Sequence, residues 1–203
     1  MSRPNYLVMD LETQKSFKEV GGKSNFGKLK ISVAGVYDYL TDQYLCYEER
    51  ELMALEKRIR EADLVIGFNI EHFDMPVLAP YLFIRIEDVP VLDLLHAVEK
   101  ARGHRASLDS IAGPTLNKHK SGTGADALIL YKENRMDELK RYCLDDVRLT
   151  KEVFEYGCEK GKILFTSTWD YKTYEIPVTW REEAAARERK SKTPEAVFPT
   201  SLF

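Results

Sequence analysis

The sequence has few cysteines, no long apolar run and no excess of positive charge. Its three cysteines, Cys46, Cys143 and Cys158, are odd in number and widely spaced, and they include no CxxC pair. This excludes a disulfide framework and favours a reducing, cytoplasmic location. No apolar run approaches the roughly 18–20 residues of a membrane span, and the N-terminal segment lacks the small-residue cleavage site of a signal peptide. We therefore expect a cytoplasmic protein that makes no membrane contact.

The balance of charge excludes one broad class of partner. The chain has 30 Lys and Arg residues against 33 Asp and Glu, and its net charge is −3, whereas a protein that coats nucleic acid without specificity is usually basic. An enzyme that handles nucleic acid at a single site remains compatible with this charge. The 203 residues, of which 44% are hydrophobic and 31% charged, suffice for one domain with a full core.

The order of predicted elements is that of a mixed α/β domain. Runs rich in β-branched and aromatic residues predict strands over residues 6–13, 31–40, 44–48, 63–69, 89–93, 162–168 and 174–179. Helices are expected over residues 49–62, 72–81, 94–102, 108–112, 126–132 and 136–157. The second and third strands form a hairpin, so the first three strands are expected to be antiparallel. The order predicts a mixed central sheet flanked by helices.

The composition changes near residue 181. From there the chain is highly charged and rich in alanine, and then contains proline. We therefore expect residues 1–180 to form the domain and residues 181–203 to form a charged, flexible tail. The apolar residues 197–203 are similar to short peptides that dock on sliding clamps, although the glutamine of such peptides is missing. A weak contact with a clamp or another partner is one interpretation of them, and packing on the protein's own surface is the other.

Two acids directly follow the first apolar run. Asp10 and Glu12 are two residues apart, so on a strand they share one face, with Cα atoms ~6.6 Å apart. Two like charges at this spacing repel each other and resist burial. A divalent cation bound between the two acids would relieve both effects. Alternatively, the strand simply ends in solvent, where both carboxylates are hydrated.

Two further acids lie near buried elements. Asp74 follows the second buried strand, at the sheet edge where α/β folds place ligand sites, although it can equally cap the helix that follows. Tyr142 and Asp146 are four residues apart on the apolar stripe of the long helix, so both face the core, where a carboxylate needs a partner. Asp145 lies off this stripe and is expected to be solvated.

Together these places resemble a known set of motifs. Asp-x-Glu at residues 10–12, Asn-x-x-x-Phe-Asp at 69–74 and Tyr-x-x-x-Asp at 142–146 resemble, in this order, the three motifs of the DEDD superfamily of 3′–5′ exonucleases. The third motif is especially similar to that of the proofreading domain of family B DNA polymerases, here as a stand-alone domain. The resemblance covers residues 6–157 and implies the ribonuclease-H-like fold. Because Arg141 stands where the histidine branch of the superfamily has histidine, only Tyr142 with Asp146 fits, which implies the tyrosine branch.

The resemblance implies a metal-dependent 3′–5′ exonuclease that hydrolyses terminal phosphodiester bonds of single-stranded DNA, or of RNA, and releases 5′-mononucleotides. Asp10, Glu12, Asp74 and Asp146 would hold two Mg²⁺ or Mn²⁺ ions, which hard carboxylate oxygens favour over zinc. Asp10 would bridge the ions, which would activate the attacking water and stabilise the leaving oxygen. Tyr142 would orient that water, because a phenol with a pKa near ~10 is a poor base.

Other residues are candidates for contact with the substrate. The residues beside the acids that we expect to bind the terminal nucleotide are Leu11, Thr13, Asn69 and Phe73. Phe73 can equally be packed in the core. Residues 14–30, a predicted loop, contain five lysines and one glutamate, which would guide a phosphate backbone or simply be solvated. Lys118 and Lys120, in a glycine-containing segment, allow the same two interpretations.

Three other functions stay open at this point. The motifs do not distinguish DNA from RNA, because contacts to the 2′-hydroxyl are not readable from them, so RNA trimming is one alternative. A catalytically silent nucleic-acid-binding or scaffold domain is another, although such a domain usually loses an acid and all four are present. A polynucleotide-binding adaptor that acts through the tail is the third. His72 and His96 show no metal-ligand spacing, so we expect them at surface or satisfied core positions.

Overall fold

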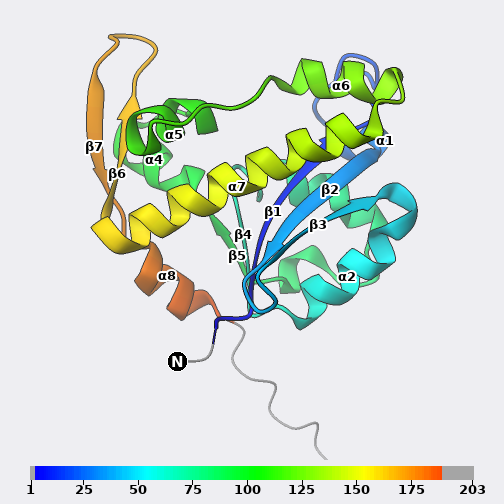
Figure 1. Ribbon diagram of the computed structural model, residues 1–203, viewed down its shortest axis with the longest axis horizontal. Coiled ribbons are helices and arrows are strands. Elements are labelled where there is room, and N and C mark those ends of the chain that lie inside the picture. The colour runs from blue at the N-terminus through cyan, green and yellow to red at the C-terminus, as the bar shows by residue number, and fades with distance from the viewer. Residues whose placement is uncertain (1–2, 189–203) are drawn as a thin grey trace, which may run out of the picture.

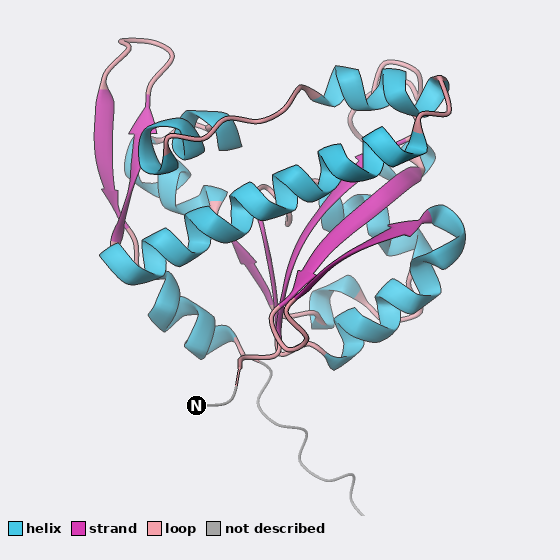
Figure 2. Ribbon diagram, viewed as in Figure 1, coloured by secondary structure: helices cyan, strands magenta, loops and turns pink. Residues whose placement is uncertain are grey.

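The computed structural model describes residues 3–188, so the apolar segment 197–203 and its suggested clamp contact lie outside the described residues. A mixed five-stranded sheet forms the centre, in the order β3-β2-β1-β4-β5 (Figures 1 and 2). Its strands are β1 (Tyr6–Thr13), β2 (Ile31–Asp38), β3 (Gln43–Glu48), β4 (Leu64–Gly67) and β5 (Val91–Asp93). The first three strands are antiparallel, and β4 and β5 run parallel to β1. The predicted ribonuclease-H-like α/β architecture is confirmed.

Helices cover both faces of this sheet. They are α1 (Phe26–Leu29), α2 (Leu52–Glu61), α3 (Asp74–Leu78), α4 (Leu95–Arg102), α5 (Leu108–Leu116), α6 (Gly124–Lys132), α7 (Met136–Lys160) and α8 (Trp180–Arg187). Short 3₁₀ helices occupy Glu49–Glu51, Ala79–Tyr81 and Ile86–Asp88. The long helix α7 crosses one face of the sheet (Figure 1). Among the described residues, no helix combines the length and the apolar character that a bilayer crossing needs.

Alternation along β1 divides the core into two layers. Val8 packs in one layer with residues of α4, α5 and α7, whereas Leu7 and Met9 pack in the other with residues of α2 and α3. Because side chains two apart on a strand share a face, Asp10 and Glu12 follow Val8 toward α7. The helix approaches closely there, since Gly35 of β2, the partner of Asp10 in the ladder, leaves room for side chains of α7.

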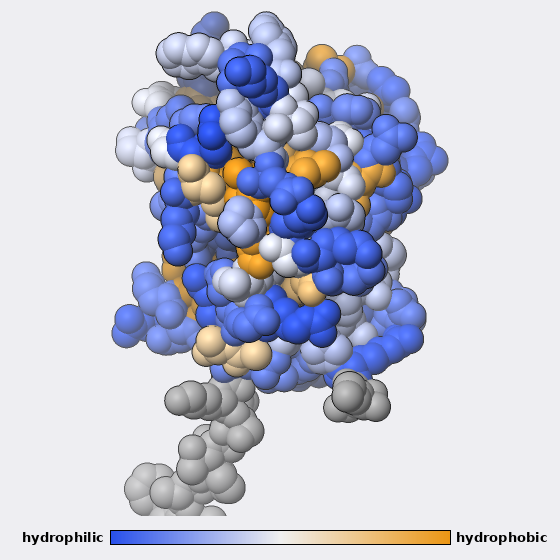
Figure 3. Space-filling model, turned by 90° about the vertical axis from the view of Figure 1, so that its left-hand side faces the viewer, coloured by the Kyte–Doolittle hydropathy of each residue, from blue (hydrophilic) through white to orange (hydrophobic). Residues whose placement is uncertain are grey.

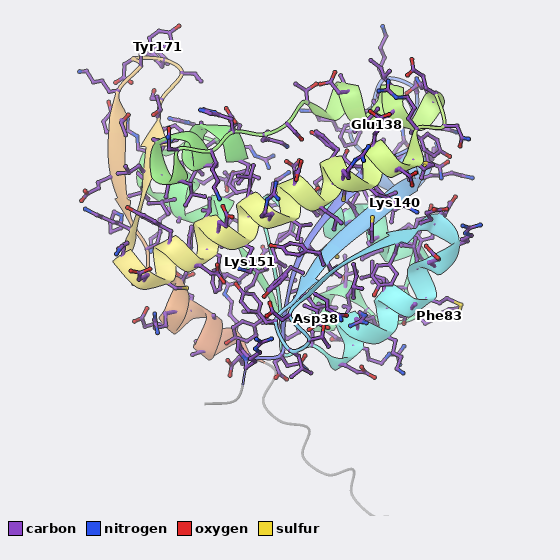
Figure 4. The ribbon with its side chains drawn as sticks, in the orientation of Figure 1. Asp38, Phe83, Glu138, Lys140, Lys151 and Tyr171 are labelled. Atoms are coloured by element: carbon purple, nitrogen blue, oxygen red, sulfur yellow. The ribbon has the colours of Figure 1, made fainter. Side chains whose placement is uncertain are left out.

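Two lysines of α7 hold the helix against the sheet (Figure 4). Lys140 Nζ lies 2.6 Å from Glu48 Oε1 at the end of β3. Lys151 Nζ lies 4.7 Å from the centre of the Tyr37 ring on β2. These two contacts join α7 to β3 and β2 beside the apolar interface.

A second, two-stranded sheet follows α7. Its strands β6 (Lys162–Thr166) and β7 (Thr173–Pro177) confirm the predicted hairpin. The hairpin projects from the domain, with Tyr171 at its tip (Figure 4). The face seen in Figure 3 is mostly hydrophilic, with hydrophobic side chains gathered in a small area near its centre.

Several predicted elements differ from the structure, most clearly in three helices. Residues 14–30 contain the single-turn helix α1, because Leu29 turns into the core. Helix α5 continues four residues further than expected, to Leu116, where Asn117 caps it, and α7 continues past residue 157 to Lys160, where Gly161 caps it. Both of these capping residues have the left-handed backbone conformation, with φ of 55° and 67°, that commonly terminates a helix.

The expectation that the chain frays from residue 181 was wrong for residues 181–187, whereas residues 189–203 of the expected tail lie outside the described part of the chain. The segment forms α8, in which Trp180 and Ala184 are only 1% and 2% exposed. These two residues are four apart and therefore share one helix face, which packs in the layer beneath α7. Of the charged residues between them, Arg181 and Glu182 are exposed and Glu183 is partly exposed, so a composition typical of a tail conceals an amphipathic helix.

Candidate active site

Three of the four predicted acids converge where β1 meets α7. The carboxylate oxygens of Asp10, Glu12 and Asp146 lie within 4.8 Å of one another. Asp10 and Glu12 are half-buried on β1, and Asp146 on α7 is 1% exposed. Elements that are far apart in the sequence thus bring three negative charges into one group, which requires a positive partner.

Asp74 lies beside this group and faces the backbone of β1. It is 3% exposed at the start of α3, and its Oδ1 accepts a hydrogen bond from the Leu11 amide at 3.0 Å. Burial, together with repulsion from Asp10, raises the pKa of this carboxyl group well above its ordinary value. Asp74 therefore joins the end of β1 to α3.

All nine residues singled out from the sequence line a single open cavity of about 580 Å³. They are Asp10, Leu11, Glu12, Thr13, Asn69, Phe73, Asp74, Tyr142 and Asp146. Asp145 lies outside it and pairs instead with Arg148 at 2.6 Å on the surface.

The acids strongly perturb one another. Burial, assisted by repulsion from Asp146, raises the pKa of Asp10 to about 8. Burial likewise raises the pKa of Glu12 well above its ordinary value, with repulsion from Asp10 and Asp146 adding to it. The pKa of Asp146 is also raised by burial. Such shifts are typical of functional sites, where carboxylates are held together against their mutual repulsion.

Lys120 supplies one positive charge to the cluster. Its Nζ lies 2.6 Å from Asp146 Oδ2. Burial alone would lower the pKa of Lys120, but the attraction of Asp146, Asp10 and Glu12 outweighs it and raises the pKa. Lys118, which the sequence placed with Lys120, pairs instead with Glu152 at 2.7 Å and does not line the cavity.

Two buried oxygens of the site lack a partner. Within residues 3–188, neither Asp146 Oδ1 nor Tyr142 Oη makes a hydrogen bond, although buried polar groups are almost always paired. The carboxylate oxygens are the ligands that Mg²⁺ and Mn²⁺ prefer, and the unpartnered Asp146 oxygen belongs to the converging group. The residues present therefore fit a divalent cation.

Tyr142 is placed to act as a neutral hydroxyl. It is 6% exposed, and burial, together with the charges of Asp146, Glu12 and Asp10, raises the pKa of its phenol. At neutral pH the hydroxyl keeps its proton, so it can donate or accept a hydrogen bond but is a poor base.

One wall of the cavity is aromatic. Phe73 packs edge-on against Phe17 and Phe26, with ring centroids 6.0 Å and 6.5 Å away, and all three line the cavity. The sequence left open whether Phe73 contacts the substrate or packs in the core. In the structure Phe73 packs against core residues and also lines the cavity. Phe17 lies in the loop after β1 and Phe26 begins α1, and their spacing in the sequence matched no helix or strand period. Of the five lysines in that loop, Lys23 is among the residues that line the cavity.

Arg105 also went unnoticed in the sequence. It lies between α4 and α5, lines the cavity, and donates a hydrogen bond to Asn69 Oδ1. Asn69 itself has a positive φ of 63°, and its amide donates to Asp93 Oδ1 at 2.8 Å. Arg105 lies in no recognisable motif, so its sequence gave no signal of this position.

A family model of the RNase H superfamily matches residues 8–158. The chain belongs to the RNase H superfamily. The matched region of this RNase H superfamily protein contains the central sheet, α7 and every residue of the acid cluster, whereas the second hairpin and α8 follow it.

A solved structure supports the same fold. This RNase H superfamily chain is similar to the family B DNA polymerase from the hyperthermophilic archaeon Pyrobaculum calidifontis, with a TM-score of 0.57 and 19% sequence identity. The match covers 76% of this chain and 24% of the polymerase chain, so the chain corresponds to about a quarter of that protein. At this identity the likeness shows the fold alone. No curated protein sequence matches the chain significantly.

The raised pKa values in the acid cluster predict how the stability of the metal-free protein, prepared in EDTA, depends on pH. The unfolded chain titrates Asp10 near ~3.9, whereas its pKa in the fold is about 8. Between these values the folded state retains a proton that the unfolded state has released, so the free energy of unfolding decreases as pH rises. We expect the Tm in EDTA to fall between pH 5 and pH 8, with a smaller fall in Asp10→Asn.

The measurement is a set of circular-dichroism melts, with and without Mn²⁺. Added Mn²⁺ should raise the Tm and flatten its pH dependence, because a ligand that binds only the folded state stabilises it. Equal pH dependence in the wild type and in Asp10→Asn would contradict the assignment of this effect to the cluster.

Proposed function

We propose that this RNase H superfamily protein is a metal-dependent 3′–5′ exonuclease of the DEDD type, in the tyrosine branch, acting on single-stranded DNA. The observation that carries the proposal is the convergence of Asp10, Glu12 and Asp146 in one cavity with Asp74 and Tyr142. The fold likeness to a family B DNA polymerase is in keeping with the resemblance of the three motifs to its proofreading domain.

Asp10, Glu12, Asp74 and Asp146 would hold Mg²⁺ or Mn²⁺. When bound, two such ions would supply Lewis-acid activation of water and stabilise negative charge on the leaving oxygen. The chain itself positions these ligands: β1 presents two of them, α7 presents the third, and the Leu11 amide orients Asp74. The unpartnered hydroxyl of Tyr142 orients the attacking water, and Lys120 limits the net negative charge that a phosphate must approach.

The cavity suits the last nucleotide of a strand. Its aromatic wall of Phe17, Phe26 and Phe73 offers faces on which a base can stack, and Lys23 and Arg105 offer positive charge to the phosphates. A terminal base must leave its own stack to enter such a cavity, which single-stranded DNA permits most readily. Thr13 and Leu11, also in the lining, would contact the sugar of that nucleotide.

The proposed function is tested with a 5′-labelled single-stranded DNA, an RNA of the same sequence and a circular DNA. We expect an Mn²⁺-dependent ladder that shortens from the 3′ end, release of 5′-mononucleotides, and no cleavage of the circle. Cleavage of the circle would contradict an exonuclease. Faster loss of the RNA would favour RNA trimming, and binding without degradation would favour the silent-domain alternative.

Replacement of Tyr142 with phenylalanine tests its role. We expect Tyr142→Phe to lower kcat by about 10- to 100-fold, because a hydrogen bond to the attacking water is worth about 1.5–3 kcal/mol. The Tm should stay nearly constant, since the hydroxyl has no hydrogen-bond partner among the described residues. Steady-state kinetics and thermal melts measure both effects.

Tyr156→Phe is the matched control for this variant. Tyr156 lies on the same helix, α7, but does not line the cavity, so its kcat should equal that of the wild type. An unchanged kcat in Tyr142→Phe would remove Tyr142 from the proposed mechanism.

A further inference from the structure

A second group of metal-ligand side chains lies beside the acid cluster. His72 is in the turn between β4 and α3, and His96 and Glu99 are on α4. Their ligand atoms lie within 4.8 Å of one another. His96 and Glu99 are three residues apart and share one helix face, and the two imidazole rings meet edge to face with centroids 5.9 Å apart. His72 is exposed and His96 partly exposed, in keeping with the expected surface positions, but their separation of 24 residues concealed the group that they form.

Ordinary hydrogen bonding leaves most of these ligand atoms available. In the described part of the chain, the His72 ring makes no hydrogen bond, and its only ring contact is with His96. His96 Nε2 lies 3.7 Å from Glu71 Oε2, which is longer than a hydrogen bond. Glu99 Oε1 lies 3.4 Å from Arg105 Nε. Glu71 and Arg105 are therefore ion-pair neighbours of the group, and neither contact is a short hydrogen bond that a bound ion would have to replace.

The backbone around the group is held by one buried carboxylate. Asp93, at the end of β5, is 2% exposed. It accepts hydrogen bonds from the amides of Asn69 at 2.8 Å and Glu71 at 3.2 Å, in the turn that carries His72. It also accepts one from the Leu95 amide, at the start of α4, at 3.0 Å. The same side chain thus fixes the turn and the helix relative to each other, as the support of a ligand site must.

We propose that His72, His96 and Glu99 bind a first-row transition-metal ion, Zn²⁺ in particular, at a site separate from the carboxylate cluster. Two imidazole nitrogens and one carboxylate oxygen form a ligand set that zinc accepts with a fourth position open. Nitrogen ligands disfavour Mg²⁺, which selects oxygen. The two sites therefore differ in the ions that they prefer.

The present spacing is close to what an ion requires. With metal–ligand bonds of ~2.0–2.2 Å in tetrahedral geometry, ligand atoms are ~3.4 Å apart, compared with at most 4.8 Å here. Small changes in side-chain torsion close this difference, because His72 is exposed and His96 and Glu99 are partly exposed. His72 also lines the large cavity, so the open position of the ion would lie at the rim of the proposed nuclease site.

Cobalt substitution in the whole protein tests the site. Co²⁺ replaces Zn²⁺ in such sites, and its visible spectrum separates nitrogen and oxygen ligands from sulfur ligands such as the free cysteines. In excess Mg²⁺, which occupies the carboxylate cluster, we expect one equivalent of Co²⁺ to bind with a nitrogen-type spectrum and to be displaced by Zn²⁺. His72→Gln and His96→Gln should each lose this spectrum, while melts report whether the variants remain folded.

Matched variants separate this proposal from the proposed nuclease function. The two other histidines of the chain are the controls, and His104→Gln and His119→Gln should keep the spectrum. The double variant Asp10→Asn with Glu12→Gln should also keep it. The proposal is overturned if the wild type binds no Co²⁺ in excess Mg²⁺, if folded His72→Gln and His96→Gln retain the spectrum, or if the carboxylate variant loses it. None of these outcomes depends on nuclease activity.

Discussion

Asp146→Asn is expected to lower the rate of 3′-end degradation by on the order of 10³-fold, whereas Asp145→Asn should leave it unchanged. The two neighbours on α7 have the same chemistry but opposite surroundings. Asp146 is 1% exposed and belongs to the converging carboxylates, while Asp145 pairs with Arg148 at the surface. Loss of a charged ligand removes several kcal/mol of transition-state stabilisation, and each 1.36 kcal/mol is a factor of ten in rate.

The measurement is a single-turnover assay on 5′-labelled DNA at saturating Mn²⁺, which isolates the chemical step. Asp146→Asn also removes the charged partner of Lys120, so thermal melts must accompany the kinetics. Comparable rates for folded Asp146→Asn and the wild type would contradict the proposed mechanism. A large loss of the degradation rate in Asp145→Asn would show that Asp145, and not Asp146, is the functional acid.

Trp180→Ala is expected to reduce the free energy of unfolding by about 3–5 kcal/mol. Trp180 is 1% exposed, and its ring stacks on Phe154 with centroids 6.4 Å apart and planes at 27°. Gly157 of α7 makes this packing possible, because a Cβ at that position would overlap the indole ring. Removal of the indole opens a large cavity under α7, which the rigid helix cannot fill by moving.

Urea denaturation followed by circular dichroism measures this cost. The other tryptophan of the chain is the matched control, since Trp169 is 92% exposed and its replacement should change stability by no more than about 0.5 kcal/mol. If the segment that begins near residue 181 were a flexible tail, the two variants would be equally stable. A large difference between them therefore establishes that α8 belongs to the fold in solution.

Much of the fold was predictable because its signals are local. The apolar run of residues 6–9 marks a strand that is buried on both faces, and the spacing of Tyr142 and Asp146 marks one face of a helix. The predicted sheet class and both hairpins were confirmed. The nine residues taken from the motifs do line one cavity, although their roles in binding and catalysis remain predictions.

Other features depended on contacts that local patterns do not encode. Charged residues in α8 concealed Trp180 and Ala184, because two buried positions in eight residues produce a weak periodic signal. Lys120 pairs with Asp146 although Lys120 belongs to no motif, and Arg105, which donates to Asn69, belongs to none either. In each case the partner comes from an element that is distant in sequence.

The sequence by itself determined the order of the strands and of every helix except α1 and α8, and it determined which face of β1 and which face of α7 carry the acids. These properties follow from the periods of two and 3.6 residues, which are fixed by the backbone. Only the tertiary structure decided that Asp10, Glu12 and Asp146 form one group while Asp74 turns to the Leu11 amide. It also brought His72 to His96 and Glu99. The reason is physical: distances between side chains on different elements are set by how those elements pack, and packing depends on the shape of the whole core.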